Sequence, residues 1–276
     1  MIFEAFSPCP ALRTYVKSYH VRHFTFGHTT NIPFKPYAAR PEHTLAFFPR
    51  DAEGVDYLAG GVRSQRPPSA VIGQHTLRTN RHLGKDFIVF IVDFYPGVLF
   101  RLLGIPLQQL TNTYVDAEVF FSGDIRRVNE RLNSAGCYQE MKGIIEQFLV
   151  GLVGKIKKAP HAIDQVSNLL AQQPGYASLD ALADGCCLGP RQFQRTFIER
   201  MGIGPKLFAR IARFDKAFRM KNNHPHLDWL TIALACGYHD YQHLVRDYLH
   251  FAAATPTAFY QEEIKAPERY FGRHEH

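Results

Sequence analysis

The chain has 276 residues, of which 46% are hydrophobic and 21% are charged. This composition is typical of folded globular proteins and excludes disordered, collagen-like and low-complexity classes. The longest apolar runs, 87–92 and 148–154, are too short to span a bilayer, so no membrane partner is expected. Residues 1–20 lack the apolar core of a secretory signal, which predicts a cytoplasmic location.

The cysteines give no sign of a disulfide framework or of a metal site. There are five, at 9, 137, 186, 187 and 236, and none forms a C-x-x-C pair or lies near histidines at zinc spacing. We therefore expect reduced, mostly buried thiols, with no bound metal and no cofactor.

The positive charge is concentrated in one part of the sequence. The formal net charge is +7, and residues 189–221 contain nine Lys/Arg but only two acidic residues. A segment of this kind can neutralise several phosphates of a nucleic acid. A solvated helix surface is the alternative explanation.

The first 125 residues are predicted to be rich in β-strands. Short aromatic and β-branched runs at 14–21, 44–48, 69–76 and 86–94 are separated by Gly, Pro, Asn and Asp. The prolines at 33, 36, 41, 49, 67 and 68 favour turns and edge strands. These features indicate a β-barrel or sandwich, with a short helix after Pro96.

The hydrophobic period changes after about residue 124. Residues 139–157 have apolar side chains at helical spacing, and this stripe suits either the core of its own domain or a dimer interface. The basic segment 154–160 then predicts a domain boundary. Beyond it, helices are expected near 161–172, 178–184, 190–201, 205–222, 228–236, 240–250 and 256–264.

This helical region contains an internal repeat. Leu182, Ala183 and Cys186 correspond to Ile232, Ala233 and Cys236, and Phe193, Arg195 and Phe197 correspond to Leu244, Arg246 and Tyr248. Each copy is a short helix with a small residue at its centre, a tight turn and a second amphipathic helix, as in a helix-turn-helix unit. Ser178 and Asp240 are suitable N-caps.

The second helix of each predicted unit has the side chains that a DNA-reading helix needs. Arg hydrogen-bonds guanine and Gln hydrogen-bonds adenine in the major groove. The helix from Pro205 to about Asn222 is about 27 Å long, which suits two such helices about 34 Å apart in successive grooves. The expected base-facing residues are Arg191, Gln192, Gln194, Arg195, Tyr241, Gln242, His243 and Arg246. Arg210, Arg213 and Lys216 are candidate phosphate contacts, although Arg213 also suits a buried ion pair.

Residues 160–264 resemble the DNA-binding domain of AraC-family transcriptional regulators. The closest correspondence is IALACGYHDYQHLVRDYLHFAAATPTAFY, which has the family's I-A-x-x-x-G-[YF]-x-D and T-P-x-x-[FY] patterns. Two departures lie in the first unit, where Cys187 replaces the usual turn glycine and Gly189 the usual Ser/Thr cap. A third is Ala253 or Ala254, where the family usually has glycine. The resemblance implies binding to double-stranded promoter DNA, with RNA polymerase and a second copy of the chain as further candidate partners.

The front part resembles, more loosely, the cupin-like sensor domains that precede such tails. The phrase PGVLFRLLGIP looks like one bacterial subgroup of these regulators. The resemblance implies an α+β protein, with a cupin-like β-barrel or sandwich plus helices at 1–155 for an unknown small-molecule effector or dimerisation. An all-α double helix-turn-helix domain at 160–264 and a polar tail at 265–276 follow.

The main alternative is a cupin-like ligand-binding protein or enzyme whose helical tail makes only protein contacts. The histidines at 20, 23, 28, 75 and 82 do not form the cupin metal set, and no G-x-S-x-G, P-loop or H-E-x-x-H pattern occurs. A DNA-repair methyltransferase would need a zinc-binding cysteine set and a P-C-H-R-like nucleophile, neither of which is present. The sequence therefore favours a non-enzymatic regulator.

Overall fold

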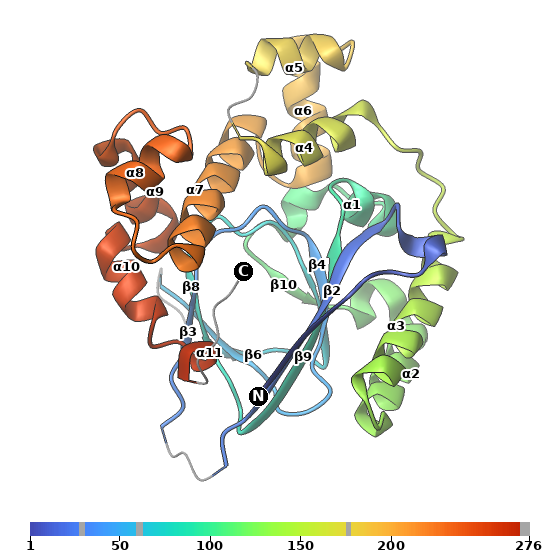
Figure 1. The fold of residues 1–276 in the computed structure, drawn as a ribbon. Helices are drawn as coiled ribbons and strands as arrows, with labels where there is room; N and C mark the ends of the chain where they lie inside the picture. The colour runs from blue at the N-terminus through green and yellow to red at the C-terminus, as the bar shows by residue number, and fades with distance from the viewer. Residues whose placement is uncertain (28–30, 59–62, 175–177, 271–276) are drawn as a thin grey trace.

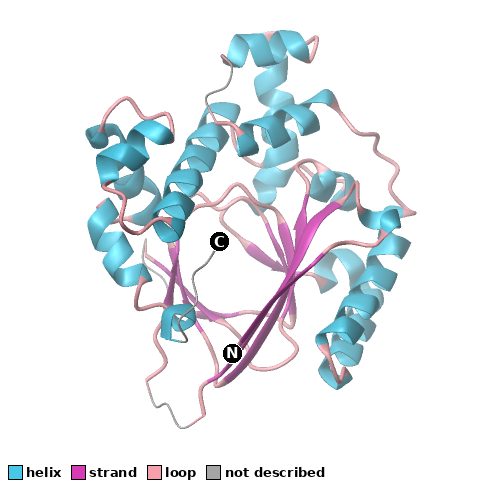
Figure 2. Ribbon diagram, in the orientation of Figure 1, coloured by secondary structure: helices cyan, strands magenta, loops and turns pink. Residues whose placement is uncertain are grey.

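The computed structural model describes residues 1–27, 31–58, 63–174 and 178–270. An antiparallel two-sheet region is followed by a helical region that arches over one end of the sheets (Figures 1 and 2). The expectation of an α+β chain with a β-rich front and an all-α tail is confirmed. Residues 28–30, including His28, lie outside the described residues.

The larger sheet has the strand order β1-β2-β9-β4-β7-β10 and the smaller one β3-β8-β5-β6. All neighbouring strands are antiparallel. Three of the four predicted runs contain β4, β7 and β9, and the run 14–21 covers the first part of β2. Pro36 lies on the edge strand β3, which suits its missing N–H. The larger sheet consists of β1 (Ile2–Phe6), β2 (Val16–Thr25), β4 (Thr44–Phe47), β7 (Ser69–Ile72), β9 (Asp86–Phe94) and β10 (Tyr114–Asp116); the smaller one consists of β3 (Lys35–Tyr37), β5 (Gly54–Tyr57), β6 (Ser64–Gln65) and β8 (Thr79–His82).

Helices cover the outer face of the larger sheet (Figure 1). Helix α3 (Tyr138–Val153) buries Met141, Ile144, Ile145 and Leu149 in the core that it shares with this sheet, so the predicted stripe packs on its own domain. Helix α2 (Glu118–Ser134) lies outside the predicted elements, although Phe121, Ile125, Val128 and Leu132 follow helical spacing. The remaining short elements are η1 (Pro10–Leu12), α1 (Val98–Leu103), which is the helix predicted after Pro96, and η2 (Leu107–Leu110).

The helical region follows the predicted boundaries to within about two residues. Its helices are α4 (Ala162–Gln172), α5 (Leu179–Gly185), α6 (Pro190–Met201), α7 (Pro205–Asn223), α8 (Trp229–Ala235), α9 (Tyr241–Ala252), α10 (Pro256–Glu263) and α11 (Pro267–Tyr270). Ser178 and Asp240 cap α5 and α9 as expected, and Pro205 occupies the first turn of α7.

Two expectations from the sequence are wrong. The segment 265–276 is not simply a polar tail, because residues 267–270 form α11 and Glu268 is buried; residues 271–276 lie outside the described residues. The cysteines are all free, but only Cys236 is buried, whereas Cys137 and Cys187 are exposed. In the described ranges, no helix is long and apolar enough to span a membrane.

Buried ion pairs join the sheets to the last helices. Lys35 on β3 contacts the carboxylates of Glu263 and Glu268, and all three side chains are buried. Arg78, next to β8, is also buried and pairs with Glu262 of α10, whose side chain is partly exposed. Removing one partner of a buried pair leaves an uncompensated charge, so these contacts fix the helical region on the sheets.

We expect the substitution Lys35→Met to destabilise the protein by about 3 to 5 kcal/mol, because two buried carboxylates lose their cation. Urea unfolding followed by circular dichroism measures the change. The control is Arg126→Met, which removes an exposed pair with Glu118 and should have little effect. Equal stability of the two variants would contradict a structural role for the Lys35 cluster.

Candidate nucleic-acid interface and ligand cavity

The two predicted units have the same turn geometry. In the first, the N–H of Cys186 donates to the carbonyls of Leu182 and Ala183; in the second, the N–H of Cys236 donates to those of Ile232 and Ala233. The N–H groups of Leu188 and Tyr238 then bond the carbonyls of Ala183 and Ala233 at 3.1 and 3.0 Å. Helices α5–α6 and α8–α9 are therefore two copies of one helix-turn-helix element.

The second helix of each unit has a buried and an exposed face. Phe193 and Phe197 of α6, and Leu244 and Tyr248 of α9, are at most 2% exposed and lie in the core of the helical region. Six of the eight expected base-facing residues are exposed on the other side: Arg191, Gln192, Gln194, Arg195, Gln242 and Arg246.

The other two expected base-facing residues are half-buried. Tyr241 packs against the core of the helical region. His243 lies with its Nε2 3.2 Å from Arg213 Nη2, and burial together with Arg213 lowers the pKa of its imidazole. These positions connect α9 to the rest of the fold.

Several of the clustered cations have partners within the protein. Arg210 and Arg213 of α7 both contact Asp247 of α9, at 2.7 and 3.4 Å, and Asp247 is 1% exposed. Arg213 also lies over the Tyr238 ring. The alternative expected for Arg213, a pair with a buried acid, is confirmed. Three further cations are also paired within the protein. Arg200 forms an ion pair with Asp164, Arg219 forms one with Asp215, and Lys221 donates to the carbonyls of Pro225 and Leu227.

Side chains of the front region hydrogen-bond the C-terminal ends of α6 and α9. His43 donates from Nε2 to the Met201 carbonyl at 3.1 Å, and Thr111 donates to Gly202 at 2.9 Å, which anchors the end of α6. Arg78 donates to the Ala252 carbonyl at 3.2 Å, at the end of α9. Carbonyls at helix ends lack partners within the helix, so these donors stabilise both ends from outside.

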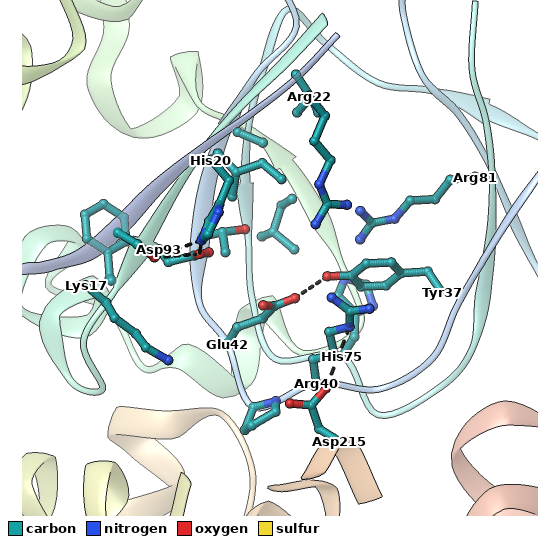
Figure 3. Close-up of a pocket in the computed structure, with 18 of the residues that line it drawn as sticks. Lys17, His20, Arg22, Tyr37, Arg40, Glu42, His75, Arg81, Asp93 and Asp215 are labelled. Atoms are coloured by element: carbon teal, nitrogen blue, oxygen red, sulfur yellow. Dashed lines mark hydrogen bonds and ion pairs between the residues drawn. The ribbon is translucent and has the colours of Figure 1, made fainter. Parts of the chain in front are cut away.

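A cavity of about 770 Å³ lies between the two sheets and reaches the helical region. Its apolar wall includes Phe24, Phe48 and Phe87. Helix α7 contributes Ala212, Asp215, Lys216 and Arg219, and α4 contributes Asn168, Ala171 and Gln172. Lys216, expected at a DNA phosphate, therefore borders this cavity, and Arg40 from the front region approaches Asp215 to 3.9 Å across it (Figure 3).

Arginines dominate the charge deep in the cavity. Arg81 lies over the Tyr37 ring at 3.2 Å, and Arg66 lies over the Tyr114 ring at 3.3 Å. Burial, with help from both arginines, lowers the pKa of His75 to about 3, so His75 is neutral. Burial alone would raise the pKa of Tyr114, but the two cations outweigh it and the net shift is downward.

A Ser-His-Asp group at the cavity wall does not have the geometry of a catalytic triad. Ser18 Oγ and Asp93 Oδ2 lie 2.9 and 3.1 Å from the same atom, His20 Nε2. A triad needs the acid and the nucleophile on different ring nitrogens. Within the described ranges, no cluster of three His, Cys, Asp or Glu residues is arranged to hold a metal.

Comparisons with known proteins match both halves of this description. The family model of a helix-turn-helix domain matches residues 182–262, and that of a domain of unknown function, DUF6597, matches residues 4–116. No curated protein matches the sequence. Two structures of ToxT from Vibrio cholerae have a similar fold at 10% identity. One, in a P21 crystal form, has a TM-score of 0.50 and covers 89% of this chain and 99% of its own. The other, bound to (E)-4-(8-methylnaphthalen-1-yl)but-3-enoic acid, has a TM-score of 0.51 and covers 90% and 100%.

The fold and the two repeated units define a helix-turn-helix DNA-binding protein. Residues 182–262 thus belong to the helix-turn-helix domain family, and the chain shares its overall fold with ToxT.

The sequence pattern of the front region does not indicate the cavity arginines. Arg22 lies between Val21 and His23 in the long strand β2, and Arg81 lies between Asn80 and His82 in the short strand β8, where a solvent-facing side chain is the ordinary interpretation. Only the pairing of two sheets reveals that both face an internal space. Asp247 was also missed, since an acid between Arg246 and Tyr248 does not indicate by itself a contact with α7.

The turn of the first unit is strained where that of the second is not. Cys187 has φ +54°, while the equivalent Gly237 has φ +79°. A side chain in this left-handed region costs roughly 1 kcal/mol, whereas glycine adopts it freely.

We expect Cys187→Gly to stabilise the protein by about 0.5 to 1 kcal/mol, since it removes this strain. The measurement is the urea midpoint, compared with Cys187→Ala, which removes the thiol but keeps the strained Cβ. A gain of the same size in both variants would attribute the effect to the thiol instead.

Proposed function

We propose that the protein binds promoter DNA by inserting α6 and α9 into successive major grooves. Arg191, Gln194 and Arg195 would read bases in one half-site, and Gln242 and Arg246 in the other, with Gln192 beside them. The repeated turn with exposed Arg and Gln on both second helices carries this proposal. Paired hydrogen bonds from Arg to guanine and from Gln to adenine provide the specificity.

The cations of α7 have a different role from that of direct phosphate contacts. Arg210 and Arg213 orient α9 through Asp247, and Lys216 borders the cavity. The phosphates are instead contacted at the N-terminal turns of α6 and α9, where the helix dipole favours an anion; α6 has no side-chain cap, whereas Asp240 caps α9.

Residues 1–155 form the effector-binding domain in this proposal, and residues 160–264 the DNA-binding domain. A structure of ToxT, which has the same fold, contains a small organic acid. Here the cavity is bordered by α7, the helix that connects the two units, so an occupant contacts the DNA-binding region directly. A ligand changes DNA affinity only if it binds one arrangement of the two domains better than another. Contacts with RNA polymerase and with a second copy of the chain belong to the same proposal.

The test is fluorescence anisotropy of the full-length protein on its own upstream DNA and on scrambled DNA, over a salt series. We expect Arg195→Ala and Arg246→Ala each to lose about 1 to 3 kcal/mol of binding to the upstream site only. Arg126→Ala, on the exposed face of α2, is the matched control and should bind like the wild type.

Equal binding of both DNAs, unchanged by either substitution, would contradict base reading. Little affinity for any DNA at low salt would favour the alternative function, in which the helical region makes only protein contacts.

A further inference from the structure

The deep end of the cavity contains more positive than negative charge. Arg22 comes from β2 of the larger sheet and Arg81 from β8 of the smaller one, and their guanidinium groups point toward the same space (Figure 3). With Arg66, three cations line this end, against the two carboxylates of Glu42 and Glu53. Glu42 accepts a hydrogen bond from the Tyr37 hydroxyl.

Part of this charge has no hydrogen-bond partner. Arg66 is 5% exposed and its Nε lies 2.6 Å from Glu53 Oε2, but its two Nη atoms have none among the described residues. The same holds for Nε of Arg81, which is 9% exposed. Buried polar groups are nearly always satisfied by protein, water or ligand, and these donors belong to side chains that line the cavity.

One wall of the cavity is apolar. Phe24, Phe48 and Phe87, with Ala46, Ile72 and Val89, form a continuous cluster that borders it. A ligand that fits both ends has one acidic group and a hydrophobic body. The planar fork of arginine suits a carboxylate better than a hydroxyl or an amide, because it offers two parallel donors.

We propose that the cavity binds an amphipathic organic monoanion, whose acidic group lies between Arg22, Arg66 and Arg81 and whose apolar body lies against the phenylalanines. This deepens the proposed function, since it gives the chemical class of the effector. The same surplus of positive charge disfavours cationic ligands. Arg81 and Arg66 are then the residues that determine specificity, held in place by stacking on Tyr37 and Tyr114.

The test compares acids with their neutral amides by isothermal titration calorimetry on the full-length protein without DNA. The probes are 4-phenylbutanoate, 1-naphthoate and decanoate, each with its amide. We expect at least one acid to bind at least tenfold more tightly than its amide. Arg81→Met, and the charge-balanced pair Arg66→Gln with Glu53→Gln, should abolish that preference. Arg63→Gln, an exposed arginine paired with Asp56, is the control and should keep it.

Acids and amides that bind equally, no binding of any acid at millimolar concentration, or an acid preference that survives Arg81→Met would each overturn the proposal. Circular dichroism confirms that each variant is folded. DNA affinity is measured separately with the bound acid present: if it does not change, the effector role fails while the anion site stands.

Discussion

The arrangement of α6 and α9 depends on hydrogen-bond donors that the front region supplies to the C-terminal ends of these helices. A helix end that faces protein needs partners for its last carbonyls. Here His43 and Thr111 supply them for α6, and Arg78 supplies one for α9. Both recognition helices are thus fixed to the same body of sheet, in addition to being joined by α7. Any movement of the sheets relative to one helix must break or stretch these bonds.

Helix α7 has two working faces. One carries Arg210 and Arg213, which hold Asp247 and thereby the register of α9. The other carries Asp215, Lys216 and Arg219, which border the cavity. The buried acid on α9 and the cavity are therefore separated only by the thickness of one helix. A molecule in the cavity would therefore contact α7, and α7 in turn contacts α9 through Asp247.

The helical region could be predicted from the sequence to within about two residues, because its apolar period, its caps and its repeated turn are local signals. Ser178 and Asp240 are examples, since an N-cap is specified by one side chain and the next three residues. Helix α2 carries the same kind of local signal, since Phe121, Ile125, Val128 and Leu132 have helical spacing, and it could have been predicted too. The roles of Arg66, Arg81 and Lys216 depend on which surfaces meet in three dimensions, and no spacing along the chain records that. The exposed Arg and Gln of α6 and α9 were found because their positions follow directly from helix geometry.

Cavity, connecting helix and both recognition helices all belong to one polypeptide. Cooperative responses in regulators commonly arise when several identical sites switch together. Where ligand binding and DNA binding are coupled within a single chain, one ligand molecule is enough to change the DNA affinity of that chain. The dose–response curve of such a chain is hyperbolic and graded, and a sigmoidal curve would be the sign of additional coupling between copies on the promoter.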